Sequence, residues 1–164
     1  MRKILLLSDT HGYIDDRIIY YANQSDEVWH AGDIGDISII DKLSSISRIR
    51  AVYGNIDDHK IRMTFPEKIN FHCEEIRIYM IHIGGYPGLY NAKIKKELLE
   101  MKPDIFISGH SHILKIINDK KNNILHLNPG AAGKNGFHSV RTMIRFEINK
   151  NKIENLEVIE LGKK

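Results

Sequence analysis

The sequence contains a single cysteine, Cys73, so the chain cannot form an internal disulfide bond. It also lacks any apolar run that approaches the roughly 20 residues needed to cross a bilayer. The apolar run at residues 4–7 is too short for the core of a signal peptide and is followed by serine and aspartate. Because disulfides are typical of secreted proteins, these absences favour a cytoplasmic protein without a membrane segment.

An excess of charge of one sign is also missing. The chain has 24 Lys and Arg against 21 Asp and Glu, a formal net charge of +3, which is no strong signal for a nucleic-acid partner. Its 164 residues can bury about two-thirds of the unfolded surface. No repeat or linker interrupts them, so we expect one domain over residues 1–164. The sequence leaves open whether the chain forms a homo-oligomer.

The first third of the chain alternates apolar runs with segments of helical period. Apolar runs at 3–9, 27–33 and 48–55 predict three buried strands. The segments at 14–24 and 37–46 carry apolar residues on one helical face and predict two helices. This βαβαβ order is typical of a parallel sheet covered by helices.

The pattern then changes to strand pairs. Residues 68–82 predict two strands joined by a turn, 91–101 a helix with Asn91 as N-cap, and 103–110 a further strand. Polar residues at 119–122 and 149–151 predict the turns of two more hairpins. A βαβαβ start followed by antiparallel pairs indicates an α/β protein with two sheets packed together and helices outside.

Donor side chains follow five of the predicted strands at the ends where α/β sheets bind ligands. They are Asp9 and His11, Asp33, Asn55, His82, and His110 with His112. The pairs spaced two apart project to one side if the backbone stays extended. Gly32, Gly54 and Gly109 each stand directly before a donor, where glycine permits a tight turn toward a ligand. A single glycine before a donor is common at the end of a strand, whereas three glycines in the same relation to a donor favour a ligand-binding site.

Two aspartates, one asparagine and four histidines suit a pair of borderline divalent ions. Manganese is favoured, and zinc, iron or nickel also fit. Calcium and magnesium fit poorly because they prefer all-oxygen shells, and seven donors exceed what one tetrahedral zinc uses. Two divalent ions with two aspartates leave a charge of about +2 for a bridging hydroxide and an anionic substrate. The donor set therefore points to phosphoryl chemistry with two metal ions per chain.

These motifs resemble those of the calcineurin-like metallophosphoesterases. The shared stretches are D-x-H at 9–11, GD at 32–33, GN at 54–55, a strand-end histidine at 82 and GHSH at 109–112. HAGD at 30–33 and NPG at 128–130 are similar to the small bacterial and archaeal phosphodiesterases of that superfamily. The resemblance implies a four-layer α/β/β/α sandwich with two mixed sheets packed face to face. Pro129 and Gly130 are expected to shape the chain beside the metal edge.

The resemblance also implies a division of the donors. One metal would take Asp9, His11, Asp33 and His112, and the other Asp33, Asn55, His82 and His110, with Asp33 bridging. The implied activity is hydrolysis of a small phosphodiester, in which a hydroxide between the metals attacks phosphorus in line. Asp33, Asn55 and His110 would be catalytic in such an enzyme.

One departure from the family concerns the proton donor. Relatives with strong monoesterase activity carry a histidine directly after GN, whereas this chain reads GNID. His59 is the nearest substitute in the sequence and is our candidate general acid, with Asp57 and Asp58 as alternatives. The missing histidine favours diesters over monoesters, because a poor leaving group needs a proton donor.

The other histidines have structural interpretations beside functional ones. His30 is expected to be a partner of a ligand or a satisfied core residue. His72 and His126 lie in predicted hairpin strands and are interpreted as structural. His138, with Arg141, could contact a substrate phosphate or cap a loop.

Two rival functions remain open at this point. The resemblance extends to the retromer subunit built on this fold, which is a non-catalytic protein scaffold. A phosphomonoesterase, protein phosphatase or nuclease of the superfamily is the second rival, although such enzymes generally need additional segments. A scaffold would not need all seven donors, so their presence favours catalysis.

Overall fold

The first apolar runs form three parallel strands. In the computed structural model, which describes all 164 residues, these are β1 (Arg2–Leu7), β2 (Glu27–His30) and β3 (Arg48–Ala51). Helices α1 (Asp16–Ala22) and α2 (Ile37–Ser44) connect them. The carboxylates of Asp15 and Asp36 cap the two helices by accepting backbone N–H bonds. The predicted βαβαβ start is confirmed.

The C-terminal hairpin extends this first sheet. Strand β9 (Val140–Asn149) runs antiparallel to β1, and β10 (Lys152–Lys163) pairs with β9. The resulting order is β10-β9-β1-β2-β3. The predicted turn at 149–151 is therefore confirmed.

The second sheet has the order β4-β5-β6-β8-β7. Its strands are β4 (Lys68–Cys73), β5 (Ile76–Ile81), β6 (Ile105–Ile107), β7 (Leu114–Asp119) and β8 (Ile124–Pro129). Both predicted hairpins are present, and helix α4 (Ala92–Met101) starts at the predicted N-cap, Asn91. The parallel pairing of β6 with β5 and β8 was not predicted, because periodicity identifies a strand but not its partner.

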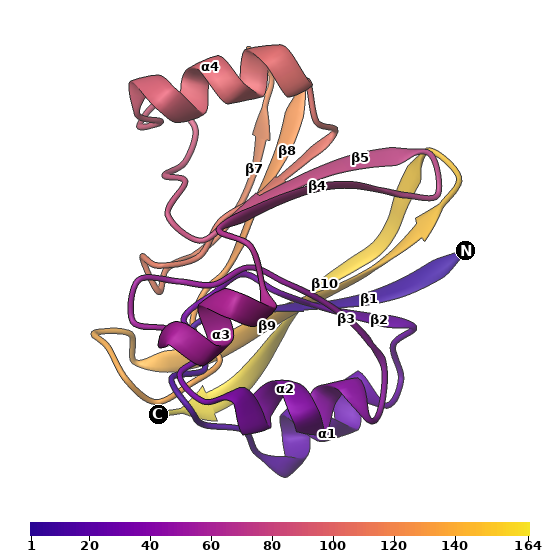
Figure 1. Cartoon of the computed structure of the whole chain (residues 1–164). Helices are drawn as coiled ribbons and strands as arrows, with labels where there is room; N and C mark the ends of the chain where they lie inside the picture. Colours follow the sequence, from indigo (N-terminus) through magenta and orange to yellow (C-terminus); the bar gives the residue numbers. More distant parts are fainter.

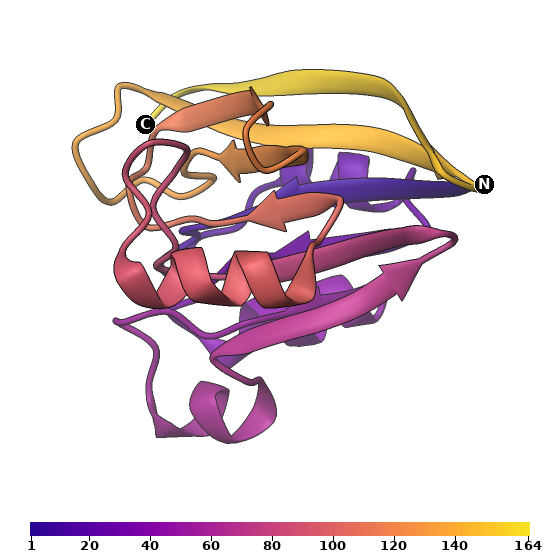
Figure 2. The same ribbon diagram turned by 90° about the horizontal axis from the view of Figure 1, so that it is seen from above.

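The helices and sheets form four layers, which Figure 1 shows from the side, while Figure 2 looks down on α4 and the second sheet. The largest inter-sheet side chains, Trp29 and Phe146, pack with isoleucines and leucines of both sheets in the central core. A second cluster joins the first sheet to α1 and α2, and a third joins the second sheet to α4. The predicted α/β/β/α sandwich is confirmed.

One element was missed. Helix α3 (His59–Thr64) follows β3 and begins after Asp58, whose carboxylate accepts the N–H of Ile61. At six residues it is too short for a helical period to stand out in the sequence. None of the helices has the length and apolar character needed to cross a membrane.

Candidate metal centre

The carboxyl ends of the parallel strands of both sheets meet at one edge of the sandwich. The backbone N–H of His110, after β6, donates to Asp9 Oδ2, after β1, at 3.2 Å. Gly54 lies so close to Asp33 that a Cβ atom there would be 2.1 Å from Asp33 Oδ1. A Cβ atom at Gly109 would be 2.2 Å from Ser8 Oγ. Glycine is therefore required at these two positions by close approach between segments.

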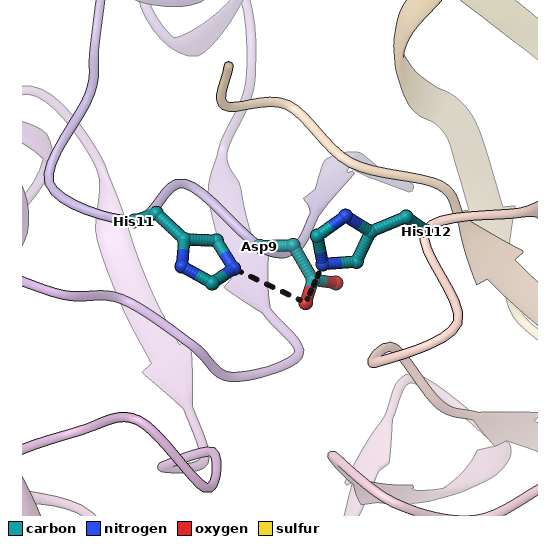
Figure 3. A group of neighbouring side chains, drawn as sticks. All are labelled: Asp9, His11 and His112. Atoms are coloured by element: carbon teal, nitrogen blue, oxygen red, sulfur yellow. Dashed lines mark ion pairs between the residues drawn. The ribbon is translucent and has the colours of Figure 1, made fainter. Parts of the chain in front are cut away.

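The first group of donors is Asp9, His11 and His112 (Figure 3). His112 Nε2 lies 3.1 Å from Asp9 Oδ1, and His11 Nε2 lies 3.9 Å from the same oxygen. Both rings therefore direct their ε nitrogens to one carboxylate oxygen.

The second group is Asp33, His82 and His110. His82 Nε2 lies 3.2 Å from Asp33 Oδ1, and the rings of His82 and His110 are 5.3 Å apart. The other oxygen, Asp33 Oδ2, lies 3.6 Å from His11 Nε2 of the first group. Asp33 thus faces donors of both groups, as a bridging carboxylate of the kind that the family resemblance implies would do.

Buried donor atoms in both groups lack hydrogen-bond partners. They are Asp9 Oδ1, His11 Nε2 and His82 Nε2. Buried polar atoms without a partner are rare because each loses its hydration without compensation. A cation bound between these atoms would supply the missing interaction, so the residues fit divalent metal ions of the kind that imidazole and carboxylate prefer.

The backbone at the donors is left-handed rather than extended. Asp9, His11, Asp33, His110 and His112 have φ angles of 54°, 47°, 53°, 67° and 57°. The condition under which the spaced pairs would project to one side, a backbone that stays extended, is therefore not met. The chain turns sharply after each strand, and such conformations in residues other than glycine cluster at functional sites.

The pKa values reflect an ion pair at the second group. Burial alone would raise the pKa of Asp33, but the imidazole of His82 close to its carboxylate and the N–H of Ile56 hold it below its usual value. Burial alone would lower the pKa of His82, but the close carboxylate of Asp33 and the charge of Asp9 raise it. Without a metal, a proton on His82 therefore offsets the buried negative charge.

His30 holds the two loops that carry the aspartates. Its Nδ1 accepts the N–H of Gly32, so its Nε2 carries the hydrogen and donates to Thr10 Oγ1 at 2.9 Å. The Thr10 hydroxyl donates in turn to the carbonyl of Ile34. Burial lowers the pKa of His30 to about 4, which keeps the ring neutral. His30 thus supports the loops of Asp9 and Asp33 from the core.

Asn55 lies in a turn held by Asp57 and Arg62, in structural roles that the sequence did not predict. The Asp57 carboxylate accepts the N–H groups of Gly35 and Gly54, both at 2.7 Å. Arg62 of α3 donates to the carbonyls of Gly54, Asn55 and Asp57. The contact with Gly35 joins segments distant in sequence, and those of Arg62 come from an unpredicted helix, so no sequence pattern revealed them.

The candidate proton donors after Asn55 have different surroundings. The carboxylate of Asp57 is occupied by two backbone N–H groups, and that of Asp58 caps α3. We therefore withdraw both alternatives to His59. His59 is exposed at the first turn of α3 and makes no side-chain hydrogen bond, so its role as general acid stays a prediction.

Asn128 of the NPG stretch fixes the segment that carries His110. Its side-chain amide donates to the carbonyl of Gly109 at 2.9 Å and lies 3.2 Å from Ser111 Oγ, while its oxygen accepts the N–H of Gly130. This arrangement agrees with the structural interpretation of NPG.

Arg141 donates hydrogen bonds to the Asp15 carboxylate and to the carbonyl of Ala132, and its side chain is buried.

A family model described as the calcineurin-like phosphoesterase superfamily domain matches residues 2–151. The chain therefore belongs to this metal-dependent superfamily. A probable metallophosphoesterase of Methanocaldococcus jannaschii is 33% identical over 133 residues, which cover 77% of this chain and 66% of that protein. The chain thus aligns with just under two-thirds of this relative.

Solved structures show the same fold. Vps29 of Entamoeba histolytica in complex with Zn²⁺ has a TM-score of 0.75 at 18% identity, covering 96% of this chain and 98% of the other. A structure described as a novel archaeal phosphodiesterase has a TM-score of 0.69 at 19% identity, covering 97% and 99%. At these identities the likeness concerns the fold.

Proposed function

We propose that the protein is a phosphodiesterase that depends on a dinuclear metal centre. The observation that carries this proposal is the pair of neighbouring three-donor groups, which contain buried donor atoms without hydrogen-bond partners. One ion would be held by Asp9, His11, Asp33 and His112, and the other by Asp33, Asn55, His82 and His110. Manganese is the favoured ion.

Divalent ions bound there would supply Lewis-acid charge to a phosphoryl group and lower the pKa of water. The residues of this chain orient the metal ligands and the substrate. His82 donates its Nδ1 hydrogen to the carbonyl of Ala31 at 2.8 Å, because a carbonyl only accepts, and this leaves Nε2 free to face the centre in the neutral ring. Asn55 is exposed, and the N–H of the next residue, Ile56, donates to Asp33 Oδ1; in the proposed enzyme Asn55 would contact the substrate as well as an ion.

A cavity beside the second group has room for one ester substituent. Its volume is about 250 Å³, and it is bordered by Asn55 and His82. Tyr53, Arg62, Glu67 and Ile83 contribute to its walls. A substrate with a substituent on each side of phosphorus could place one here and direct the other to solvent, which supports a diester.

The lack of a histidine directly after Asn55 supports the same preference. A diester monoanion with an acidic leaving group can react without protonation, whereas an alkyl monoester needs an acid. The side chain after Asn55 is Ile56, and the next two carboxylates bind backbone groups. We therefore propose small phosphodiesters as the substrates, and a cytosolic, single-domain enzyme.

The proposal is tested by comparing two esters with one leaving group. Metal-free protein is reloaded with Mn²⁺ and assayed on methyl p-nitrophenyl phosphate and on p-nitrophenyl phosphate. We expect the diester to be cleaved faster and a chelator to stop the reaction. Asp9→Asn is the control for contaminating phosphatases, because activity of the chain itself should disappear in it. Faster cleavage of the monoester would contradict the diester preference.

Similarity to Vps29 over nearly the whole chain favours a second candidate, a non-catalytic scaffold. A scaffold would bind metal without hydrolysing either ester. The same assay therefore separates the two candidates when the metal content of each sample is measured beside it.

A further inference from the structure

The loop between β8 and β9 brings His138 against His112 of the first donor group. The two Nδ1 atoms are 3.3 Å apart, and the rings meet edge to face with centroids 5.2 Å apart. On its other side, His138 Nε2 lies 3.0 Å from the carbonyl oxygen of Gly133. His138 therefore contacts a candidate metal ligand and the backbone of its own loop at once.

These contacts define where the hydrogens lie. A carbonyl oxygen only accepts, so His138 Nε2 carries a hydrogen, and in a neutral ring His138 Nδ1 is then an acceptor. The hydrogen between the rings consequently belongs to His112 Nδ1. This leaves His112 Nε2 without a hydrogen, 3.1 Å from Asp9 Oδ1. In a neutral His112 ring these two electron-pair donors repel each other when no cation lies between them, so in the metal-free protein it is the hydrogen bond to His138 that favours this tautomer.

The loop is built closely around the two ligands. Gly136 has φ +119°, and a Cβ atom there would lie 2.0 Å from His112 Nδ1. The N–H of Gly133 donates to the backbone carbonyl of Asp9 at 3.0 Å. The loop thus contacts both Asp9 and His112. His138 lies at the Nδ1 side of the His112 ring, whereas Nε2 of the same ring faces the centre.

His82 provides a comparison within the same centre. Its Nδ1 donates to the carbonyl of Ala31, so the backbone itself fixes which nitrogen faces the carboxylates. The structure shows only the His138 side chain as a hydrogen-bond partner for His112 Nδ1. The tautomer of His112 therefore depends on a side chain, whereas that of His82 is fixed by a main-chain carbonyl.

We infer that His138 is a positioning residue that holds His112 in its Nδ1–H tautomer and directs Nε2 of His112 toward Asp9. The inference rests on the proposed metal centre, although it concerns only residues of this chain. Partners that orient a metal-ligating histidine typically change metal affinity 10–100-fold, at the order-of-magnitude level. Loss of His138 should therefore weaken the first group selectively.

The tautomer is tested in the metal-free protein by long-range ¹H–¹⁵N NMR of the imidazole rings. His138→Phe keeps an aromatic ring without nitrogen, His138→Asn restores an acceptor oxygen near the Nδ1 position, and His72→Phe is a control at an exposed histidine on β4. We expect the Nδ1–H form of His112 to dominate in the parent and in His72→Phe. In His138→Phe the Nδ1–H form of His112 should no longer dominate, and in His138→Asn it should dominate again. An unchanged His112 tautomer in His138→Phe would overturn the inference.

Calorimetric titration with Mn²⁺ alone is the second readout. We expect one binding step to weaken about 10–100-fold in His138→Phe, the other to stay within about twofold, and His138→Asn to recover most of the loss. Equal weakening of both steps together with a lower melting temperature would indicate a general structural role and overturn selective positioning. If the parent binds no Mn²⁺, the proposed function fails, while the NMR result still decides the role of His138.

Discussion

At the scale of single residues, Asp33 is the group on which the proposed centre depends most. Its two oxygens lie 3.2 Å from His82 Nε2 and 3.6 Å from His11 Nε2, in different donor groups. Asp33→Asn keeps an oxygen that can accept the N–H of Ile56 but removes the charge that both ions would share. We expect both metal affinities to fall and turnover to drop at least about 10²-fold, since a lost metal interaction is worth several kcal/mol.

Elemental analysis and diester turnover of Asp33→Asn check this expectation. The metal-free protein should stay folded, because the contact with the backbone N–H of Ile56 survives. Asp41→Asn, on the exposed face of α2, is the matched control and should behave like the parent. An Asp33→Asn protein with two bound ions and near-normal turnover would show that Asp33 is not the bridge.

The role of His59 is also decided at this scale. His59 is not among the residues that line the cavity beside Asn55, and its side chain makes no hydrogen bond. These observations weigh against the role of general acid that we predicted for His59 from the sequence. We therefore expect the rates for a series of aryl phosphodiesters to fall steeply as the pKa of the leaving group rises, with the same slope in the parent and in His59→Ala. A shallow slope in the parent that steepens in His59→Ala would instead identify His59 as the general acid, an effect worth about 10²–10⁴ in rate.

At the scale of elements, the end of β8 positions the segment that carries His110 and His112. Gly130 has φ +72°, and a Cβ atom there would lie 2.2 Å from Thr142 Oγ1, which donates to the carbonyl of Pro129. Gly130→Val should therefore displace the turn whose Asn128 side chain holds Gly109. Backbone strain alone costs on the order of 1–3 kcal/mol, and we expect stability and diesterase activity to fall together.

Thermal melting and activity of Gly130→Val are compared with those of Gly88→Val. Gly88 has a similar φ of +89° but nothing within 4 Å of a Cβ position, so it reports backbone strain without the clash. We expect the larger loss in Gly130→Val. Lost activity with unchanged melting and metal content would point instead to a direct contact between this turn and the substrate.

The elements and the donors differ in how far the sequence could predict them. The strands and the seven donors could be found because each strand ends in a local signal, an apolar run followed by a polar residue. The roles of Asp57, Arg62, Asn128 and His138 arise from contacts between segments far apart in the chain or within the short helix α3. Such contacts leave no periodic pattern, and the left-handed turns at the donors leave none either.

At the scale of the whole molecule, His126 makes stability depend on pH. It lies on β8 in the second sheet, fully buried, and neither ring nitrogen has a hydrogen-bond partner. Burial lowers the pKa of His126 to about 4. The unfolded chain, with a histidine pKa near 6.5, therefore takes up a proton that the folded protein excludes, so stability is full above about pH 6.5 and declines as the pH falls toward about 4.

The measurement is the free energy of unfolding of metal-free protein at about pH 7 and about pH 5.5, a window above the titration of ordinary carboxylates. We expect the parent to lose about 1 kcal/mol more than His126→Leu over this window. His72→Leu, at an exposed histidine, is the control and should follow the parent. An equal loss in the parent and in His126→Leu would show that His126 is not the titrating group.

The central claim for the whole molecule is that two ions held at the joined strand ends make it a phosphodiesterase. The most direct measurement is a titration of metal-free protein with Mn²⁺ in which bound metal and hydrolysis of methyl p-nitrophenyl phosphate are followed together. We expect activity to rise with occupancy, to level off at about two ions per chain, and to vanish when a chelator removes them. A protein that binds two ions without hydrolysing the diester, or that hydrolyses it equally well in the chelator, would contradict the claim.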